Sequence, residues 1–271
     1  DINIADTVRR NRLTFCLTGN NTSEIGAVMC KAGFGDIKVC IGENLGMENE
    51  RVRKVNAGAL TQECHPSLTV LLFMNGAYDD RSPCGLPDES FVRLAGIPMT
   101  KSETRALVLS KLKLRPDFVC WDIGAGTGSV TVEMALSAYR GHVYAVERRV
   151  DGIPLIEQNC IAFHVGNVTA ICAEAPEALG PLPVPDAVFI GGSGGELGRV
   201  ISAVLDKNRG ARIVVTAVTL ETVSAALTMF EDAGLEPEIV QVNIARGKHA
   251  GKSHLMEAQN PITILSAGGK A

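Results

Sequence analysis

Short apolar runs alternate with stretches of helical spacing through the part of the chain that follows residue 100. The apolar runs predict strands at about 118–122, 142–147, 166–172, 186–190 and 210–217. Helices are predicted at about 101–112, 128–138, 151–162, 196–206 and 219–233. In the last helix Val223, Leu227 and Phe230 share one face, which is typical of an amphipathic helix. This alternation predicts a parallel sheet with helices on both faces.

Two further apolar runs end the pattern, at about 237–245 and 260–266. The residues between them form no helical pattern, so we expect a hairpin that makes the last strand antiparallel. The fold class expected for this region is therefore α/β, a doubly wound sheet with an antiparallel edge.

The first 73 residues predict a smaller α/β segment. Strands are expected at 13–17, 37–41 and 68–73, with a helix from Asn21 to about Ala32. Many Gly and Pro residues follow at 74–98, which is typical of a linker. We therefore predict a partial domain at 1–73, a linker at 74–95 and a larger domain at 96–271.

Composition narrows the classes of function. The formal net charge of −4 argues against nucleic acid as a partner, because phosphate backbones select strongly basic surfaces. The apolar runs are too short to span a membrane, and no signal-peptide pattern occurs. Eight scattered cysteines without Cys-x-x-Cys spacing suggest buried reduced thiols in a cytoplasmic protein. The histidines and cysteines show no metal-ligand spacing, so no metal is expected.

A glycine-rich turn follows the strand at 118–122. The strand ends at Asp122. Gly124, Gly126 and Gly128 follow at alternate positions before a helix begins. Glu147 ends the next strand, nineteen residues after Gly128, which is the distance at which one βα unit delivers a carboxylate to a ribose. We therefore expect an adenosine-containing cofactor on Glu147 and on the loop formed by Gly124, Ala125, Gly126, Thr127 and Gly128.

The glycine spacing helps to identify the cofactor. A dinucleotide site reads G-x-G-x-x-G, but Ser129 stands where its third glycine belongs. The spacing G-x-G-x-G after an Asp-containing strand is typical of S-adenosylmethionine-dependent methyltransferases, whose Rossmann-like sheet matches the predicted fold. A nicotinamide nucleotide and a plain tight βα turn remain as alternatives.

Further candidates lie at the other strand ends, where ligands of such sheets bind. Glu174 and Ala175 could frame an adenine, although Glu174 could simply begin a turn. Gly192, Ser193 and Gly194 belong to a glycine-rich loop that could admit a bulky substrate or could simply be flexible. Three further candidates have simpler alternatives. Thr100 could face the cofactor or form a capping box with Glu103. Arg246 and Lys248 could bind an anionic substrate or lie in a solvated loop.

Six segments resemble the decarboxylating precorrin-6Y methyltransferase family of cobalamin biosynthesis. They are residues 96–103, 121–129, 175–179, 189–195, 217–221 and 243–248. The resemblance implies methylation of a precorrin, a tetrapyrrole, at C15, with loss of carbon dioxide from the ring C acetate. It also implies cofactor contacts at Thr100, at 124–128, at Glu147 and at Ala175, and a homo-oligomer. No residue is assigned to the decarboxylation itself.

Residues 12–73 resemble the second half of the C5-methylating partner domain, whose first half is not found in this sequence. We therefore expect methylation at C15 without methylation at C5. A nicotinamide-dependent oxidoreductase and a methyltransferase that acts on RNA or protein are the competing interpretations.

Overall fold

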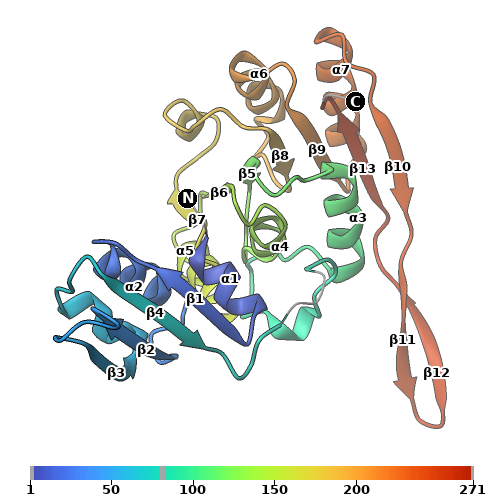
Figure 1. Cartoon of the computed structure of the whole chain (residues 1–271). Coiled ribbons are helices and arrows are strands. Elements are labelled where there is room, and N and C mark those ends of the chain that lie inside the picture. The colour runs from blue at the N-terminus through green and yellow to red at the C-terminus, as the bar shows by residue number, and fades with distance from the viewer. Residues whose placement is uncertain (1–2, 80–82, 270–271) are drawn as a thin grey trace. The chain divides into compact units, whose positions relative to one another are not determined.

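The computed structural model describes residues 3–79 and 83–269, which divide into two compact units (Figure 1). The first unit comprises Asp1–Pro83 and Gln158–Val168. The second unit comprises Cys84–Glu157 and Thr169–Ala271. The boundary at residues 83 and 84 falls inside the stretch predicted to be a linker, and residues 84–95 fold with the second unit.

The first unit contains a four-stranded antiparallel sheet in the order β1-β4-β2-β3. Its elements are α1 (Ile4–Arg10), β1 (Leu13–Leu17), α2 (Thr22–Lys31), β2 (Lys38–Glu43), β3 (Arg51–Asn56), the 3-10 helix η1 (Ala57–Gln62) and β4 (Thr69–Met74). Met29, Leu60, Leu71 and Phe73 are fully buried and form its core. The three predicted strands and the helix after Asn21 are confirmed.

Besides the 3-10 helix η1, two elements of the first unit were not predicted. Helix α1 is only seven residues long and largely polar, and the Asn3 side chain caps it by accepting from the Asp6 amide. Strand β3 holds Arg51, Arg53 and Lys54 and has no buried face. Strand β3 lacks the hydrophobic alternation on which sequence prediction depends, and α1 has only Ile4, Ala5 and Val8 as an apolar face, which is too short to be distinctive.

The second unit is built on a seven-stranded sheet in the order β10-β13-β9-β8-β5-β6-β7 (Figure 1). Its strands are β5 (Val119–Ile123), β6 (His142–Glu147), β7 (Val168–Cys172), β8 (Ala187–Ile190), β9 (Arg212–Ala217), β10 (Glu238–Val242) and β13 (Ile262–Ala267). The helices are α3 (Ser102–Leu112), α4 (Ser129–Ser137), α6 (Leu197–Lys207) and α7 (Leu220–Asp232), with short 3-10 turns η2 (Asp88–Ser90) and η3 (Glu177–Leu179). Helix α5 (Gly152–Ala162) begins in this unit, and its residues from Gln158 onward belong to the first unit. The pairs β5–β6, β5–β8 and β8–β9 are parallel, and β13 runs antiparallel between β9 and β10, as predicted.

Alternate residues of β5 face opposite layers. Trp121 and Ile123 belong to the apolar cluster that also contains residues of α6 and α7. Asp122 points to the other face, where Thr131 of α4 donates a hydrogen bond to it. Helices therefore cover both faces of the sheet, which confirms the predicted fold class.

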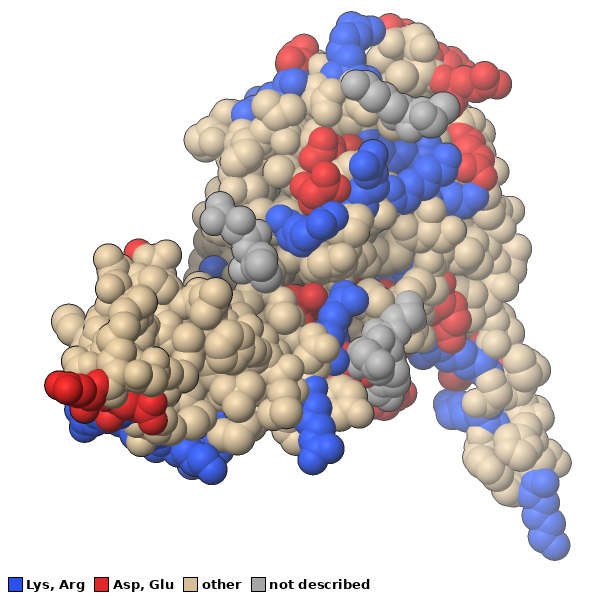
Figure 2. Space-filling view, viewed as in Figure 1, with Lys and Arg blue, Asp and Glu red and all other residues tan. Residues whose placement is uncertain are grey.

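The region between β10 and β13 differs from the predicted loop. It forms a separate two-stranded sheet of β11 (Ala245–Ala250) and β12 (Ser253–Ala258), which extends from the large sheet (Figure 1). Nearly every residue of this hairpin is exposed, so no alternation between a buried and an exposed face marks the strands in the sequence. Figure 2 shows uncharged side chains along much of the hairpin and basic ones at its far end.

A buried ionic cluster joins residues 84–91 to α3 and α4. Arg105 is fully buried and donates to Asp88 at 2.9 Å, to Glu133 at 2.8 Å and to the Thr100 carbonyl at 2.5 Å. Burial would raise the pKa of Asp88, but hydrogen bonds from Arg105 and Arg246 outweigh it and lower that pKa. The Asp88 carboxylate also accepts from the amide of Ser102, the first residue of α3.

The predicted capping box at the start of α3 is wrong. The helix begins at Ser102, and the side chain of its N-cap residue, Lys101, makes no capping hydrogen bond. Asp88, which lies fourteen residues earlier, satisfies the first free amide instead. Glu103 forms an ion pair with Arg246.

Candidate functional site

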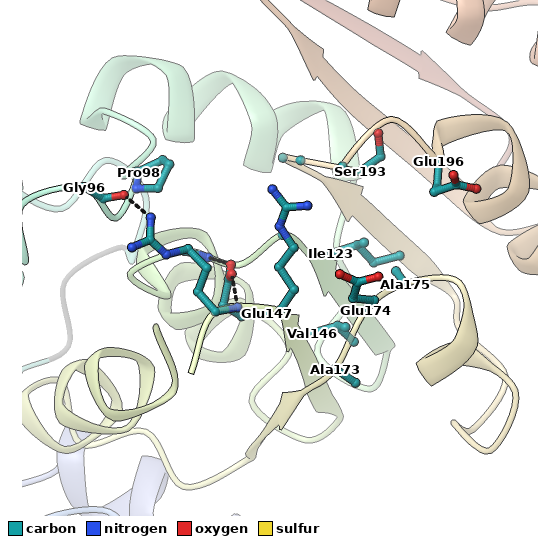
Figure 3. Close-up of a pocket in the computed structure, with 17 residues that line it drawn as sticks. Gly96, Pro98, Ile123, Val146, Glu147, Ala173, Glu174, Ala175, Ser193 and Glu196 are labelled. Carbon is teal, nitrogen blue, oxygen red and sulfur yellow. Dashed lines mark hydrogen bonds between the residues drawn. The ribbon is translucent and has the colours of Figure 1, made fainter. Parts of the chain in front are cut away.

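A cavity of about 260 Å³ opens at the carboxyl ends of β5, β6, β7 and β8 (Figure 3). Residues from each strand end line it, together with Gly96 and Pro98 from the segment before α3. The predicted site residues that line it are Gly124, Gly126, Glu147, Glu174, Ala175, Gly192, Ser193 and Gly194. The structure therefore brings the loop after β5, the acid after β6 and the loop after β8 into one cavity.

The loop after β5, residues 124–128, is tightly packed against its own chain. Gly124 and Gly126 have φ of 74° and 57°, a conformation that favours glycine. A Cβ on Gly124 would lie 2.7 Å from the Gly192 amide nitrogen, and one on Gly126 would lie 2.5 Å from the Pro98 carbonyl oxygen. The fold itself therefore requires these glycines, and evidence for a ligand must come from the cavity beside them.

Glu147 is held rigidly at the end of β6. One carboxylate oxygen accepts from the Gly126 amide at 2.8 Å, and the other accepts from the Arg149 amide at 2.8 Å. Each oxygen keeps a further lone pair, and the side chain lines the cavity. This fixed acceptor lies beside Gly124 and Gly126, and its contact with a ribose stays a prediction.

The remaining predicted cofactor residues lie just outside the cavity lining. Ala125, Thr127 and Gly128 belong to the loop but are not among the described residues that border the cavity. Thr100 offers its carbonyl oxygen to Arg105 and to the Ser129 hydroxyl, and Pro98 borders the cavity two residues earlier. Thr100 therefore supports the wall, and its contact with the cofactor stays a prediction.

Asp122 lies beneath the loop and is fully buried. Burial raises the pKa of this carboxyl to about 7; the Thr131 hydrogen bond opposes the shift and the nearby Glu147 charge adds to it. Asp122 does not border the cavity in the part of the chain that the structure describes.

The loop after β8, residues 191–195, is more open. The amides of Gly191 and Gly192 donate to the Ile123 carbonyl, which attaches the start of the loop to β5. A Cβ on Gly192 would meet nothing within 4 Å. Ser193 and Glu196 also face the cavity, so this loop offers room for a large ligand (Figure 3).

Two cations at this site were not predicted as contacts. Arg148 and Arg149 both line the cavity, and Arg149 donates to the Gly96 carbonyl at 2.6 Å (Figure 3). Both arginines are visible in the sequence directly after Glu147, but nothing in the local pattern indicates where their side chains point.

Arg246 and Lys248 lie on β11 and are already paired. Arg246 forms ion pairs with Asp88 at 3.0 Å and with Glu103 at 2.5 Å. The hydrogen bonds within these ion pairs raise the pKa of Arg246, and the bond to Glu103 has the largest effect. Lys248 contacts Glu257 at 3.2 Å on the exposed hairpin. Neither cation borders the cavity among the described residues, and their role in substrate binding stays a prediction.

The structure bears on three general expectations within residues 3–79 and 83–269, which concern membrane-spanning helices, metal sites and cysteines. No helix there is long and apolar enough to cross a bilayer. No group of three or more His, Cys, Asp or Glu side chains in that part could hold a metal ion. All eight cysteines are free, but Cys30, Cys64, Cys84 and Cys172 are exposed, so the expectation of uniformly buried thiols is wrong.

Comparisons with known proteins agree with this geometry. The family model described as "Precorrin methyltransferase domain" matches residues 94–268. The probable cobalt-precorrin-6B C(15)-methyltransferase (decarboxylating) of Pyrobaculum calidifontis is 42% identical over 185 residues, which are 68% of this chain and 95% of that protein.

Two solved structures are also similar. The precorrin-6Y C5,15-methyltransferase of Geobacter metallireducens has a TM-score of 0.65 and 41% identity, and the alignment covers 69% of this chain and 97% of that one. The C-terminal domain of the Rhodobacter capsulatus precorrin-6Y C5,15-methyltransferase has a TM-score of 0.61 and 33% identity. The alignment covers 69% of this chain and 99% of that one. These matches disfavour the oxidoreductase interpretation and confirm the predicted enzyme class. From residue 94 onward the chain belongs to the precorrin methyltransferase family, whose cofactor is S-adenosylmethionine.

Proposed function

We propose that this chain methylates a precorrin at C15 and removes the carboxyl group of its ring C acetate as carbon dioxide, in cobalamin biosynthesis. The observation that carries the proposal is the single cavity shared by the loop after β5, Glu147 and the open loop after β8. The name of the Pyrobaculum relative, which describes a C15-methylating and decarboxylating enzyme, supports the choice of reaction.

The residues of the cavity divide into two groups by what they can hold. Glu147 and the bare loop at Gly124 and Gly126 would hold the ribose and amino-acid parts of S-adenosylmethionine, and Glu174 would accept from the adenine amino group. When bound, this cofactor supplies an electrophilic methyl group. The open loop at Gly192 and Ser193 would lie under the macrocycle, so the protein contributes positioning and exclusion of water.

The direct test is a mass spectrum of a precorrin-6B-type substrate after incubation with S-adenosylmethionine. The expected product has gained one methyl group in place of hydrogen and has lost one carbon dioxide. An unchanged substrate in the presence of bound cofactor would contradict the proposed reaction.

The cofactor assignment has its own test. We expect Glu147→Ala to weaken S-adenosylhomocysteine binding by about 1.5–3 kcal/mol, or roughly ten- to a hundredfold, in a calorimetric titration. Glu196→Ala is a matched control, because Glu196 also lines the cavity but forms an ion pair with Arg199 at 3.0 Å. Equal losses in the two variants would argue against a specific role of Glu147.

The first 73 residues are proposed to be part of a C5-methylating domain that is inactive in this chain. The similarity between residues of the second unit and the C-terminal domain of a C5,15 enzyme is consistent with such an order of domains. A reaction product with two new methyl groups would refute this proposal.

The chain is also proposed to form a homo-oligomer through the β11–β12 hairpin. Leu255 and Met256 on β12 are 61% and 69% exposed, and an isolated two-stranded hairpin is marginally stable in water. Light scattering should therefore show a multimer, and Leu255→Asp should shift it toward the monomer. A monomeric wild type would contradict the proposal.

We place the enzyme in the cytoplasm, with no nucleic-acid partner. The eight free cysteines fit a reducing compartment, and the net charge of −4 is unfavourable for binding a phosphate backbone.

A further inference from the structure

The side chain of Arg148 reaches from the end of β6 to the loop after β8. A Cβ built on Gly194 would lie 2.9 Å from one of its guanidinium nitrogens. Strand β5 lies between β6 and β8 in the sheet, so the side chain crosses above the end of β5. Arg148 thus lies in the cavity that Glu147 also lines, against the loop that is proposed to carry the substrate.

Arg148 is also the cation of this cavity that lacks an internal partner. Five charged residues line the cavity: Glu147, Arg148, Arg149, Glu174 and Glu196. Arg149 is bound to the Gly96 carbonyl, whereas Arg148 makes no hydrogen bond or ion pair with any residue within 3–79 and 83–269. Its planar fork of N–H donors is therefore free to bind a carboxylate in a bidentate way.

We infer that Arg148 binds a carboxylate of the substrate and thereby orients the macrocycle over the cofactor. This inference rests on the proposed function, because it requires a polycarboxylate substrate on the loop after β8. The absence of a side chain at Gly194 leaves the guanidinium the space in which it lies. Arg246 is less suited to this role, since a substrate would have to displace both Asp88 and Glu103 from it.

The electrostatics of the cofactor favour a substrate anion at Arg148. S-adenosylmethionine carries a positive sulfonium that repels a guanidinium in the same cavity. Glu147, Glu174 and Glu196 reduce this repulsion, and an anion bound directly to Arg148 would reduce it further. A substrate carboxylate would be such an anion. The carboxylate of the cofactor itself is the competing ligand, and the two are distinguished by experiment.

The experiment compares Arg148→Gln with Arg148→Lys and Arg246→Gln. Binding of a precorrin-6B-type polycarboxylate is titrated with S-adenosylhomocysteine already in place, so that no turnover occurs, and S-adenosylhomocysteine binding is titrated separately. We expect Arg148→Gln to weaken binding of the polycarboxylate roughly ten- to a hundredfold and to change S-adenosylhomocysteine affinity less than about twofold. Arg148→Lys should restore part of the affinity, and Arg246→Gln should weaken polycarboxylate binding less than Arg148→Gln does.

Two results would overturn the inference. Unchanged polycarboxylate affinity in Arg148→Gln would show that the guanidinium holds no substrate group. A comparable loss of S-adenosylhomocysteine affinity would assign Arg148 to the cofactor instead. A wild type that binds the polycarboxylate through Arg148 but does not methylate it would count against the proposed reaction alone.

Discussion

The two glycine-rich loops of the site lie at the ends of neighbouring strands, yet their glycines have different origins. In the loop after β5, side chains at Gly124 and Gly126 would collide with main-chain atoms of Gly192 and Pro98. In the loop after β8, a Cβ at Gly192 would meet nothing within 4 Å. Gly124 and Gly126 of the first loop are therefore required by close packing of the main chain, whereas Gly192 of the second loop keeps space open. Of the two, the second is the better indicator of a large ligand.

The largest effect is expected from removing Arg105, the centre of the buried ionic cluster that joins residues 84–91 to α3 and α4. Arg105→Met would leave the carboxylates of Asp88 and Glu133 buried beside an apolar side chain and release the Thr100 carbonyl. We expect a loss of about 3–5 kcal/mol in the free energy of unfolding, measured with urea. Arg246→Met is the control, because Arg246 is partly exposed and should cost much less. Similar losses in both would mean that the burial of Arg105 does not make its ion pairs more important for stability than those of Arg246.

A direct comparison of the loops comes from alanine substitutions. Gly124→Ala would force a side chain onto a positive φ and against Gly192, and should cost about 2–5 kcal/mol. Gly192→Ala should change the free energy of unfolding by less than about 0.5 kcal/mol. Equal stabilities of the two variants in urea denaturation would contradict the proposed difference between the loops.

The pH dependence of stability should reveal Asp122 beneath the first loop. Its folded-state pKa is about 7, above the ordinary value of 3.8, so between these pH values the folded chain keeps a proton that the unfolded chain has released. The free energy of unfolding should therefore fall by about 2–4 kcal/mol as pH rises from 4 to above 7.

Asp122→Asn should flatten this dependence, since an amide does not titrate. Phe189 is the register neighbour of Asp122 on β8, so the second loop has no equivalent group below it. An identical pH profile in Asp122→Asn would show that this carboxyl is ionised in the folded protein.

The smallest effect on stability is expected from a larger side chain in the second loop. Gly192→Val should leave the free energy of unfolding within about 0.5 kcal/mol, yet weaken polycarboxylate binding roughly tenfold or more. A melting curve measures the stability of the variant, and a separate titration measures its affinity for the polycarboxylate. Unchanged binding would indicate that the macrocycle lies elsewhere.

The sequence allowed most of the second unit to be predicted, because hydrophobic periodicity marks buried elements. It did not predict β11 and β12, whose residues are exposed on both faces. Glu147 and Gly192 could be assigned to one site because the carboxyl ends of parallel strands converge. Pairing of long side chains could not be predicted, since the partners of Arg246 are 143 and 158 residues away in the chain. The position of Arg148 likewise depends on Gly194, which a different strand supplies.

The open space beside Gly192 makes the loop after β8 a suitable place for changing substrate preference in the laboratory. Randomising a position whose side chain meets no neighbour leaves most library members folded, so the library samples binding rather than failed folding. The loop after β5 offers no such freedom, because most of its variants would be lost before they could be screened. Directed evolution toward other large anionic rings should therefore begin at residues 192 and 193, with residues 124–128 unchanged.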